Sequence, residues 1–342
     1  MTRPAISLDD TSELATVLEG ELRSGGSALP PECRVPPRLL DRALFRPLLY
    51  AARQPGKQFR GRLAEVAWEL ADGVGTAPVE LALIVEALHL GSLIVDDIED
   101  GSDQRRGAPS LHRAVGLPLA LNAGNWLYFW PGIVLERSTF TSEIKLAMHS
   151  AVSRAVLRCH YGQALDLSTR VGELRRREVS DVVYATTRLK TGSLMELAAE
   201  LGALAAGASP TKLEVLAALG RDIGVALQML DDWTGLRCAR RRHKGREDLL
   251  ASRASWPWAW LAERTDSVSY RRFRTALESV TAGELDPDLL ADQLCEAIGD
   301  HAPTVIRAKL DSALSLARRV LGETKGILEL ESELERLERY DG

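Results

Sequence analysis

Apolar residues recur every three or four positions along most of the chain, and this spacing is typical of amphipathic helices. The alternation of apolar and polar residues that marks a half-buried strand is absent from the sequence. Pairs such as Gly25-Gly26 and Pro30-Pro31 break the pattern into segments. We therefore predict an all-α protein built as a single large helical bundle. Helices are expected over residues 7–23, 39–53, 59–72, 79–100, 141–170, 174–206, 210–235, 285–299 and 303–340.

Length and composition fit one large globular domain. The chain has 342 residues, of which 45% are hydrophobic and 27% charged, and its formal net charge is −5. We expect one domain over residues 1–342, and the glycine and proline pairs leave open whether residues 1–35 are a loosely packed segment. Basic residues do not form a stripe along the chain, so we expect no nucleic-acid partner.

The first residues and the cysteines bear on where the protein works. The opening stretch MTRPAISLDD lacks the apolar core of a signal peptide. No apolar run reaches the roughly 18 residues of a membrane-spanning helix, so no transmembrane segment is expected. The cysteines show no paired spacing and indicate reduced thiols of a cytoplasmic protein, not a zinc site or disulfides. They are Cys33, Cys159, Cys238 and Cys295.

An acidic cluster follows one strongly apolar helical segment. Residues 88–95 lead directly into Asp96, Asp97 and, four residues after Asp96, Asp100. In a helix, Asp96 and Asp100 lie one turn apart on the same face, and like charges at that spacing repel each other. A solvated acidic helix end is one interpretation of such a motif. A divalent cation is the other, because Mg²⁺ is usually held by one or two carboxylates together with substrate phosphates.

The same pattern occurs a second time. The apolar segment 223–230 ends at Asp231 and Asp232, and Gln228 lies three residues before Asp231 on the same helix face. Core packing does not explain two such helix ends, because a buried unpaired carboxylate costs several kcal/mol. Facing each other across a bundle, the two pairs could hold metal ions jointly.

Basic residues accompany these acidic clusters. Individually each is more often a solvated surface charge, but arginine binds phosphate oxygens bidentately and lysine binds them as a point charge. Together with two aspartate pairs they indicate a substrate with diphosphate groups and a metal bridge. The residues concerned are Lys57 and Arg60 beside Gly56, Arg105 and Arg106, Lys190 beside Thr191 and Gly192, and finally Lys244 and Arg253.

Six segments in this order resemble the motifs of one family. They are GKQFR at 56–60, DDIED at 96–100, RRG at 105–107, KTG at 190–192, LQMLDD at 227–232 and EDLLASRASWP at 247–257. The chain resembles the trans-isoprenyl diphosphate synthases, the polyprenyl synthetase family. The runs LIVDDIEDGSDQRRG and LNAGNWLYF are most similar to geranylgeranyl diphosphate synthases of the eukaryotic type.

The resemblance implies a fold, a reaction and a set of site residues. The fold would be an all-α bundle with a central cavity, a single isoprenoid-synthase-like domain, in a homodimer. The reaction would join isopentenyl diphosphate to an allylic prenyl diphosphate and give geranylgeranyl diphosphate. The implied Mg²⁺ ligands, for three ions with substrate bound, are Asp96, Asp97, Asp100, Asp231 and Asp232. The implied contacts of the allylic diphosphate are Arg105, Lys190, Thr191, Gln228, Lys244 and Arg253, and those of isopentenyl diphosphate are Gly56, Lys57, Arg60, His89 and Arg106.

The chemistry implied by the resemblance is ionisation followed by carbon–carbon bond formation. Metal ions and basic groups would neutralise the departing diphosphate, and an apolar cavity would keep water from the allylic cation. The double bond of isopentenyl diphosphate would then attack the cation, and a proton would be lost. Asp96, Asp97, Lys190 and Asp231 would be the catalytic residues. By its apolar helix face alone, His89 could equally be a satisfied core histidine.

The chain departs from the family pattern at several positions. Gly235 stands where a third aspartate often follows the second pair, and Arg253 stands where lysine is usual. Asn125 stands where many bacterial members have aspartate. The tryptophan cluster over residues 256–260 is unusual, and we interpret it as core packing or as a dimer seam.

Residues just before the first aspartate pair are expected to set the length of the product. In farnesyl-making relatives an aromatic ring four or five positions before the motif closes the cavity. Here those positions are Ser92 and Gly91, both small, so the growing tail should pass them. Leu88, one turn lower, or a residue of a facing helix such as Trp126, would close the cavity one isoprene unit later.

Two other functions remain open from the sequence. A class I terpene cyclase would use the same metals but no isopentenyl diphosphate, and the weakened second motif and the tryptophans mildly favour it because aromatic faces stabilise cations. The intact basic residues Lys57, Arg60 and Arg106 favour a prenyltransferase, which needs a second diphosphate site. A non-catalytic partner subunit of a heteromeric synthase is the third possibility, and the intact DDIED segment argues against it.

Overall fold

The computed structural model describes residues 13–24, 28–30 and 32–341 and confirms the all-α class. In this part of the chain the only strands are two short ones, paired as a hairpin. The chain separates into two compact units. Unit 1 comprises the described residues up to Glu65 together with Thr76–Ser150, and unit 2 comprises Val66–Gly75 together with the described residues from Ala151 onward.

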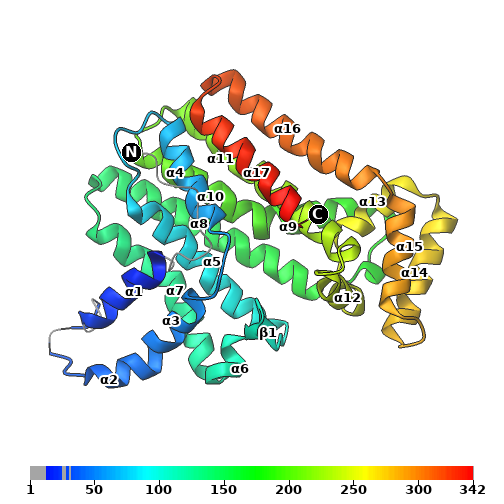
Figure 1. The fold of residues 1–342 in the computed structure, drawn as a ribbon, viewed down its shortest axis with the longest axis horizontal. Coiled ribbons are helices and arrows are strands. Elements are labelled where there is room, and N and C mark those ends of the chain that lie inside the picture. Colours follow the sequence, from blue (N-terminus) through cyan, green and yellow to red (C-terminus); the bar gives the residue numbers. More distant parts are fainter. Residues whose placement is uncertain (1–12, 25–27, 31, 342) are drawn as a thin grey trace. The chain divides into compact units, whose positions relative to one another are not determined.

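Unit 1 is built around two long helices, α5 and α7, which pack along each other (Figure 1). The N-terminal parts of α4, up to Glu65, and of α8, up to Ser150, also belong to this unit. Its elements are α1 (Glu13–Arg23), α2 (Pro37–Leu40), the π-helical turn η1 (Asp41–Phe45), α3 (Arg46–Ala52), α4 (Phe59–Leu70), α5 (Val79–Glu99), β1 (Gln104–Arg105), β2 (Ala108–Pro109), α6 (Leu111–Val115), α7 (Leu117–Arg137) and α8 (Ser142–Ser168).

Helix α7 has no counterpart among the helices predicted from the sequence. Pro118 stands in its first turn, where proline is tolerated, but Pro131 lies inside the helix and Gly124 near its middle. These residues mask the helical pattern in the sequence. Tertiary packing compensates for them, since α7 packs along α5, with Trp130 buried in the core of unit 1 and Trp126 packed against that core.

The N-terminal segment is packed where it is described. Leu14, Ala15 and Leu18 of α1 are buried, and α1 contacts α3 and α5. The described part of residues 1–35 that forms α1 is therefore not loosely attached, while residues 1–12, 25–27 and 31 lie outside the described residues.

The crossing of α5 and α7 corrects one expectation about the site. A Cβ atom on Gly91 would lie 2.9 Å from the carbonyl oxygen of Gly124 and 3.0 Å from the Cβ of Leu127. Gly91 therefore permits close contact between two backbones and does not line a space for a substrate tail. The chain-length role predicted for Gly91 is wrong for this reason. Ser92 is half-buried and donates its hydroxyl to the carbonyl of His89 at 2.7 Å.

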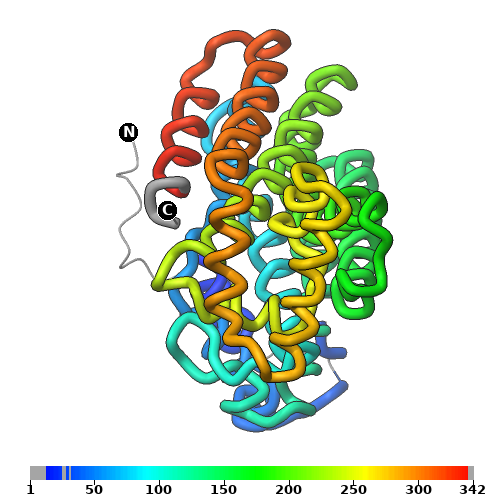
Figure 2. Tube along the Cα trace, turned by 90° about the vertical axis from the view of Figure 1, so that its right-hand side faces the viewer, coloured from blue at the N-terminus to red at the C-terminus, as the bar shows by residue number. Residues whose placement is uncertain are grey.

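Unit 2 is organised around the long helix α11, which packs against α10 and α16. Helices α16 and α17 lie side by side at the end of the chain (Figure 2). The elements are η2 (Val171–Glu173), η3 (Arg176–Glu178), α9 (Val179–Thr187), the π-helical turn η4 (Arg188–Gly192), α10 (Ser193–Ala205), α11 (Pro210–Arg237), α12 (Arg242–Leu250), α13 (Trp256–Arg264), α14 (Ser267–Thr281), α15 (Pro287–Ile298), α16 (His301–Leu321) and α17 (Lys325–Asp341).

Two helices predicted as continuous are interrupted in unit 2. The segment 174–206 contains the π-helical turn η4, and the segment 303–340 is broken at Gly322, whose φ is +81°. Helices α12, α13 and α14 were not predicted. In α13 the side chains of Trp256, Trp258 and Trp260 are all buried in the core of unit 2, which favours core packing over a dimer seam for this cluster. No helix among the described residues is long and apolar enough to cross a membrane.

The Gly91–Gly124 crossing yields a stability prediction. We expect Gly91→Ala to lower the free energy of unfolding by about 1–3 kcal/mol, because a backbone carbonyl has to move to admit the methyl group. Gly132→Ala is the matched control in α7, because its Cβ would meet only a ring carbon of His149, at 3.6 Å. The control should raise stability by up to about 1 kcal/mol through helix propensity. Equal effects of the two substitutions in chemical denaturation would contradict the close crossing.

Candidate active site

The acidic end of α5 is organised by one buried carboxylate. Asp97 is 3% exposed, whereas Asp96 is half-buried and Asp100 is exposed. Arg105 donates from Nε to both oxygens of Asp97 at 2.8 Å, and its Nη2 lies 2.7 Å from Oδ1. The same Nη2 reaches Asp96 at 3.4 Å. Burial alone would lower the pKa of Arg105, but the hydrogen bond and charge of Asp97, with Asp96 and Asp100, raise it.

The β-hairpin after α5 explains why two arginines and a glycine follow the aspartates. Arg105 ends β1 and pairs with Ala108 in β2. The two turn residues, Arg106 and Gly107, have φ values of +52° and +82°. Two-residue hairpin turns with both central φ values positive favour glycine, as at Gly107. The hairpin holds the Arg105 side chain against Asp97.

This pairing revises the predicted metal ligands of the first motif. Both oxygens of Asp97 already accept hydrogen bonds from Arg105 in the protein interior. Its position is explained by that ion pair without a metal. Asp96 and Asp100, on one face and more exposed, are the better oxygen donors for a cation.

A basic cluster lies beside this site in unit 1. A Cβ on Gly56 would come within 2.8 Å of the Arg106 guanidinium, so glycine leaves the space that this side chain occupies. Arg106 also donates to the carbonyl of Gln54 at 3.3 Å. Arg60 Nη1 lies 3.1 Å from Nε2 of His89. The structure thus brings Gly56, Arg60, His89 and Arg106 together, and Lys57 is exposed next to Gly56.

The electrostatics of this cluster favour anions. Burial and the charges of Arg60, Arg106 and Arg105 together hold the pKa of His89 well below its usual range. Its ring is therefore neutral at neutral pH. Burial and the charge of Arg105 lower the pKa of Arg106, although Glu86 opposes this shift. Several cations held close together in a partly buried site create a positive potential suited to a diphosphate.

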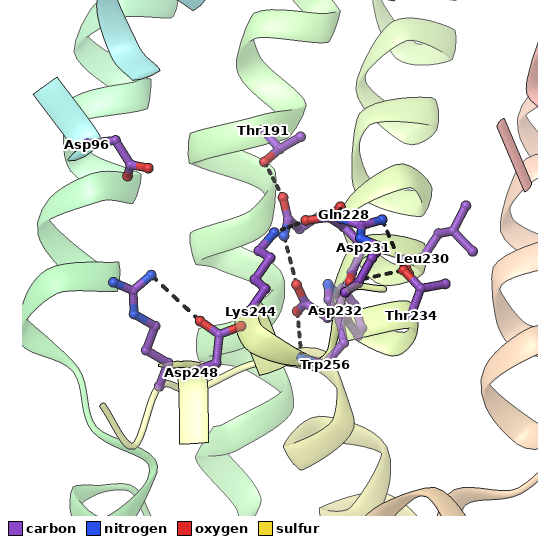
Figure 3. Close-up of polar contacts among 12 residues, drawn as sticks. Asp96, Thr191, Gln228, Leu230, Asp231, Asp232, Thr234, Lys244, Asp248 and Trp256 are labelled. Atoms are coloured by element: carbon purple, nitrogen blue, oxygen red, sulfur yellow. Dashed lines mark hydrogen bonds and ion pairs between the residues drawn. The ribbon is translucent and has the colours of Figure 1, made fainter. Parts of the chain in front are cut away.

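In unit 2 a chain of hydrogen bonds joins the KTG segment to the second aspartate pair (Figure 3). The Thr191 hydroxyl donates to Oε1 of Gln228 at 2.8 Å, and Nε2 of Gln228 donates to Oδ1 of Asp232 at 2.7 Å. The backbone N–H of Trp256 donates to the other Asp232 oxygen at 3.0 Å. Burial and the charge of Asp248 raise the pKa of Asp232 to about 7, although these hydrogen bonds oppose the shift.

These partners revise the predicted role of Asp232. Each of its oxygens accepts a hydrogen bond from a group fixed by the fold. The residue therefore connects α11 to the start of α13 and orients Gln228, and its predicted role as a metal ligand is not needed to explain its position. Asp231 instead contacts two basic side chains, Arg241 and Lys244. The structure thus places Lys244 against Asp231 of the second motif.

Asp166 is a site residue that the sequence analysis missed. It lies on α8 and accepts from Lys190 Nζ at 2.7 Å, and Arg253 Nη1 lies 3.7 Å from the same oxygen. Arg253 also lies 3.8 Å from Asp248. The turn η4 passes close to α8, since a Cβ on Gly162 would clash with the backbone of Lys190. The available signal was an acidic residue inside the helical run GQALDL.

Gly235, which stands where a third aspartate is usual, lies close to Gly245 of α12: a Cβ on Gly235 would make ordinary contacts with Gly245 at 3.6 and 3.8 Å. A Cβ on Gly245 of α12 would clash with the carbonyl oxygen of Gly235. Helix α12 therefore packs directly on α11 at this point. Arg241, at the start of α12, donates to the Thr234 hydroxyl at 3.1 Å as well as contacting Asp231. Arg241 thus lies at the second motif.

The donor atoms of both motifs fit magnesium. All are carboxylate oxygens, which hard divalent cations prefer over nitrogen or sulfur. Among the described residues, no three Asp, Glu, His or Cys side chains are grouped so that they could hold a metal ion by themselves. One or two carboxylates together with substrate phosphates are the usual setting for Mg²⁺.

Comparison with known proteins decides the family. The sequence profile described as polyprenyl synthetase matches residues 41–286. The chain belongs to the polyprenyl synthetase family. The geranylgeranyl pyrophosphate synthase of Fusarium fujikuroi is 33% identical over 288 residues, which cover 82% of this chain and 66% of that protein.

An archaeal relative is also similar. The short chain isoprenyl diphosphate synthase of Methanothermobacter thermautotrophicus is 33% identical over 179 residues, which cover 52% of this chain and 54% of that protein. The chain spans only about half of the length of several curated relatives that it matches.

Solved structures of other proteins share the fold of this chain. The geranylgeranyl pyrophosphate synthase of Lactobacillus brevis has a TM-score of 0.74 at 23% identity, covering 95% of this chain and 96% of that one. The polyprenyl synthase of Caulobacter crescentus, solved with calcium and isoprenyl diphosphate, has a TM-score of 0.71 at 20% identity, covering 99% and 98%.

The buried acid Asp248 yields a prediction on pH. Burial raises its pKa to about 6, although Lys244 and Arg253 oppose the shift. Between about pH 4 and pH 6 the folded protein keeps a proton that the unfolded chain has released, so stability falls as the pH rises through this window. Over this pH range we expect the free energy of unfolding to fall by about 1–3 kcal/mol because of Asp248, and we expect Asp248→Asn to abolish this fall.

Denaturation of both proteins at several pH values between 4 and 6 measures this effect. Asp181→Asn, the same change at an exposed position of α9, is the control and should leave the slope unchanged. If Asp248→Asn and the unmodified protein lose stability in parallel, Asp248 is not protonated in the folded protein at these pH values.

Proposed function

We propose that this chain is a Mg²⁺-dependent prenyltransferase that condenses isopentenyl diphosphate with an allylic prenyl diphosphate. The single observation that carries the proposal is that α5 presents two different sites within unit 1. Its C-terminal end carries the carboxylates Asp96 and Asp100, while His89, two turns earlier, joins the basic cluster of Arg60 and Arg106. A carboxylate site suits a metal-bound diphosphate, and a basic site suits a second diphosphate without metal.

We propose Asp96, Asp100 and Asp231 as the protein ligands of Mg²⁺, with three ions when substrate is bound. Bound Mg²⁺ would neutralise the diphosphate that leaves the allylic substrate. The allylic diphosphate would also be held by Arg105, Lys190, Thr191, Gln228, Lys244 and Arg253. Support comes from their fixed positions, because Asp97 holds Arg105, and Asp166 holds both Lys190 and Arg253.

The basic cluster would hold isopentenyl diphosphate. Arg60 and Arg106 can donate paired N–H groups to phosphate oxygens, and Lys57 adds an exposed point charge. His89 is neutral, so it does not add to the repulsion among these cations. If Arg60 donates to Nε2, the His89 proton is on Nδ1, and the ring holds the arginine in position.

We propose geranylgeranyl diphosphate as the product, in line with the names of the fungal relatives. A role in chain length for Leu88 and Ser92 remains part of the proposal, while Gly91 is excluded by its contact with α7. We also propose a homodimer, since α7 exposes the large apolar side chains of Leu117, Leu121 and Phe129. A cytoplasmic location remains a prediction from the sequence.

The proposed activity is tested by incubating the protein with Mg²⁺, isopentenyl diphosphate and, in turn, dimethylallyl, geranyl or farnesyl diphosphate. Analysis of the dephosphorylated products should reveal geranylgeraniol. Parallel reactions without isopentenyl diphosphate are the control. A hydrocarbon formed from farnesyl or geranylgeranyl diphosphate alone would show that the chain is a cyclase, and no turnover in any mixture would favour a non-catalytic partner subunit.

Replacing single aspartates should separate metal ligands from structural anchors. We expect Asp96→Asn and Asp100→Asn to raise the Mg²⁺ concentration needed for half-maximal activity by roughly tenfold, since each would remove one carboxylate from a bound ion. Asp97→Asn should lower kcat without this shift, because it releases Arg105 instead. Titration of activity with Mg²⁺ measures both effects. If Asp97→Asn raises the Mg²⁺ concentration for half-maximal activity as much as Asp100→Asn does, Asp97 is a metal ligand after all.

The two diphosphate sites should respond differently to loss of basic side chains. We expect Arg60→Ala and Arg106→Ala to raise KM for isopentenyl diphosphate more than KM for the allylic substrate. The loss of a charged hydrogen bond corresponds to about 1.5–3 kcal/mol, or roughly ten- to a hundredfold. Steady-state kinetics with each substrate varied in turn is the measurement. Equal changes in both KM values would show that the sites are assigned wrongly.

A further inference from the structure

Glu86 is a half-buried carboxylate on α5, three residues before His89, and it belongs to neither aspartate motif. Its Oε1 accepts a hydrogen bond from the backbone N–H of Gly61 at 2.9 Å. Gly61 is the third residue of α4. The first four N–H groups of a helix have no partner within the helix, so Glu86 satisfies one of them from a neighbouring helix. A negative charge is also favourable near the positive end of the helix dipole.

The start of α4 is pressed against α5 at this hydrogen bond. A Cβ on Gly61 would lie 3.1 Å from the Cβ of Ala82 and 3.5 Å from Cγ of Glu86. Ala82 and Glu86 are one turn apart on α5, so both form the surface on which Gly61 rests. The contact fixes the distance and the rotation between the first turn of α4 and the middle of α5.

The residues fixed in this way are those of the basic cluster. Arg60 immediately precedes Gly61, and its guanidinium reaches His89, which lies on α5 about one turn after Glu86. Gly56 and Lys57 precede the same turn of α4. Burial raises the pKa of Glu86, and the Gly61 hydrogen bond and the charges of Arg60 and Arg106 only partly oppose that rise. One carboxylate therefore contacts the backbone that carries Arg60 and faces the charges of both arginines.

We propose that Glu86 is a positioning residue for the homoallylic diphosphate site, which it maintains by tying the first turn of α4 to α5 through the Gly61 N–H. This proposal rests on the proposed function, because it assigns isopentenyl diphosphate to the basic cluster. Glu86 acts through Arg60 and His89 and does not itself touch substrate, since its charge would repel a diphosphate.

Two conservative variants separate the hydrogen bond from the charge. Glu86→Gln keeps an oxygen that can accept from Gly61 but removes the charge, and Glu86→Asp keeps the charge but is one methylene too short to reach. We expect Glu86→Gln to keep KM for isopentenyl diphosphate within about threefold of the unmodified protein. Glu86→Asp and Glu86→Ala should raise it by about tenfold and leave KM for the allylic substrate nearly unchanged.

The control is Glu80→Ala, a half-buried glutamate at the start of the same helix, which should change neither KM. Thermal denaturation of each variant identifies those that fail to fold. Calorimetric titration of the metal-free proteins with isopentenyl diphosphate gives a second readout that does not depend on turnover. The binding constants should follow the same order, with Glu86→Gln close to the unmodified protein.

Three results would overturn the proposal. They are equal effects of Glu86→Asp on both KM values, unchanged affinity for isopentenyl diphosphate in a folded Glu86→Ala, and a wild-type-like Glu86→Asp beside an impaired Glu86→Gln. Failure of the proposed function would look different, because the unmodified protein itself would then neither consume nor bind isopentenyl diphosphate. An unmodified protein that neither consumes nor binds isopentenyl diphosphate would leave Glu86 without the site that it is proposed to position, and so would overturn its role as well.

Discussion

A carboxylate can be buried only if a fixed partner replaces the water it loses, and this constraint explains the geometry of the first aspartate motif. Asp97 is almost completely buried, and Arg105 supplies the partner through contacts to both of its oxygens. The partner must be held in place, and the β-hairpin after α5 does so with a turn at Arg106 and Gly107. The spacing between Asp97 and Arg105 and the glycine of the hairpin turn therefore serve this one ion pair.

The second motif satisfies the same constraint with different groups. Asp232 is held by the Gln228 amide and by the backbone N–H of Trp256, and the neighbouring Asp231 contacts the basic side chains of Arg241 and Lys244. In both pairs the second aspartate accepts hydrogen bonds from groups fixed by the fold, and the first contacts basic side chains. The same principle extends to the cations, because Asp166 fixes Lys190, and Glu86 fixes the helix turn that carries Arg60. Acidic residues that do not bind substrate thus position basic residues that would.

Much of this site could be predicted from the sequence, because α5 and α11 are long apolar helices whose acidic ends need no tertiary information to be recognised. Helix α7 could not be predicted, since Pro131 disrupts its pattern and only packing against α5 compensates for it. The role of Gly91 was misjudged because a small residue beside a motif can admit a substrate or another helix, and the sequence does not distinguish the two. Asp166 was missed because its partners, Lys190 and Arg253, are distant in sequence.

The central claim is that the two aspartates of each pair have different roles. The first would bind a metal ion, and the second makes hydrogen bonds that hold the structure together. This claim is tested most directly by a crystal structure of the protein with Mg²⁺, isopentenyl diphosphate and an unreactive allylic thiolodiphosphate. We expect Asp96, Asp100 and Asp231 to coordinate the metal ions, with Asp97 still bound to Arg105 and Asp232 still bound to Gln228 and Trp256. Coordination of Mg²⁺ by Asp97 or Asp232, with loss of those hydrogen bonds, would contradict the account.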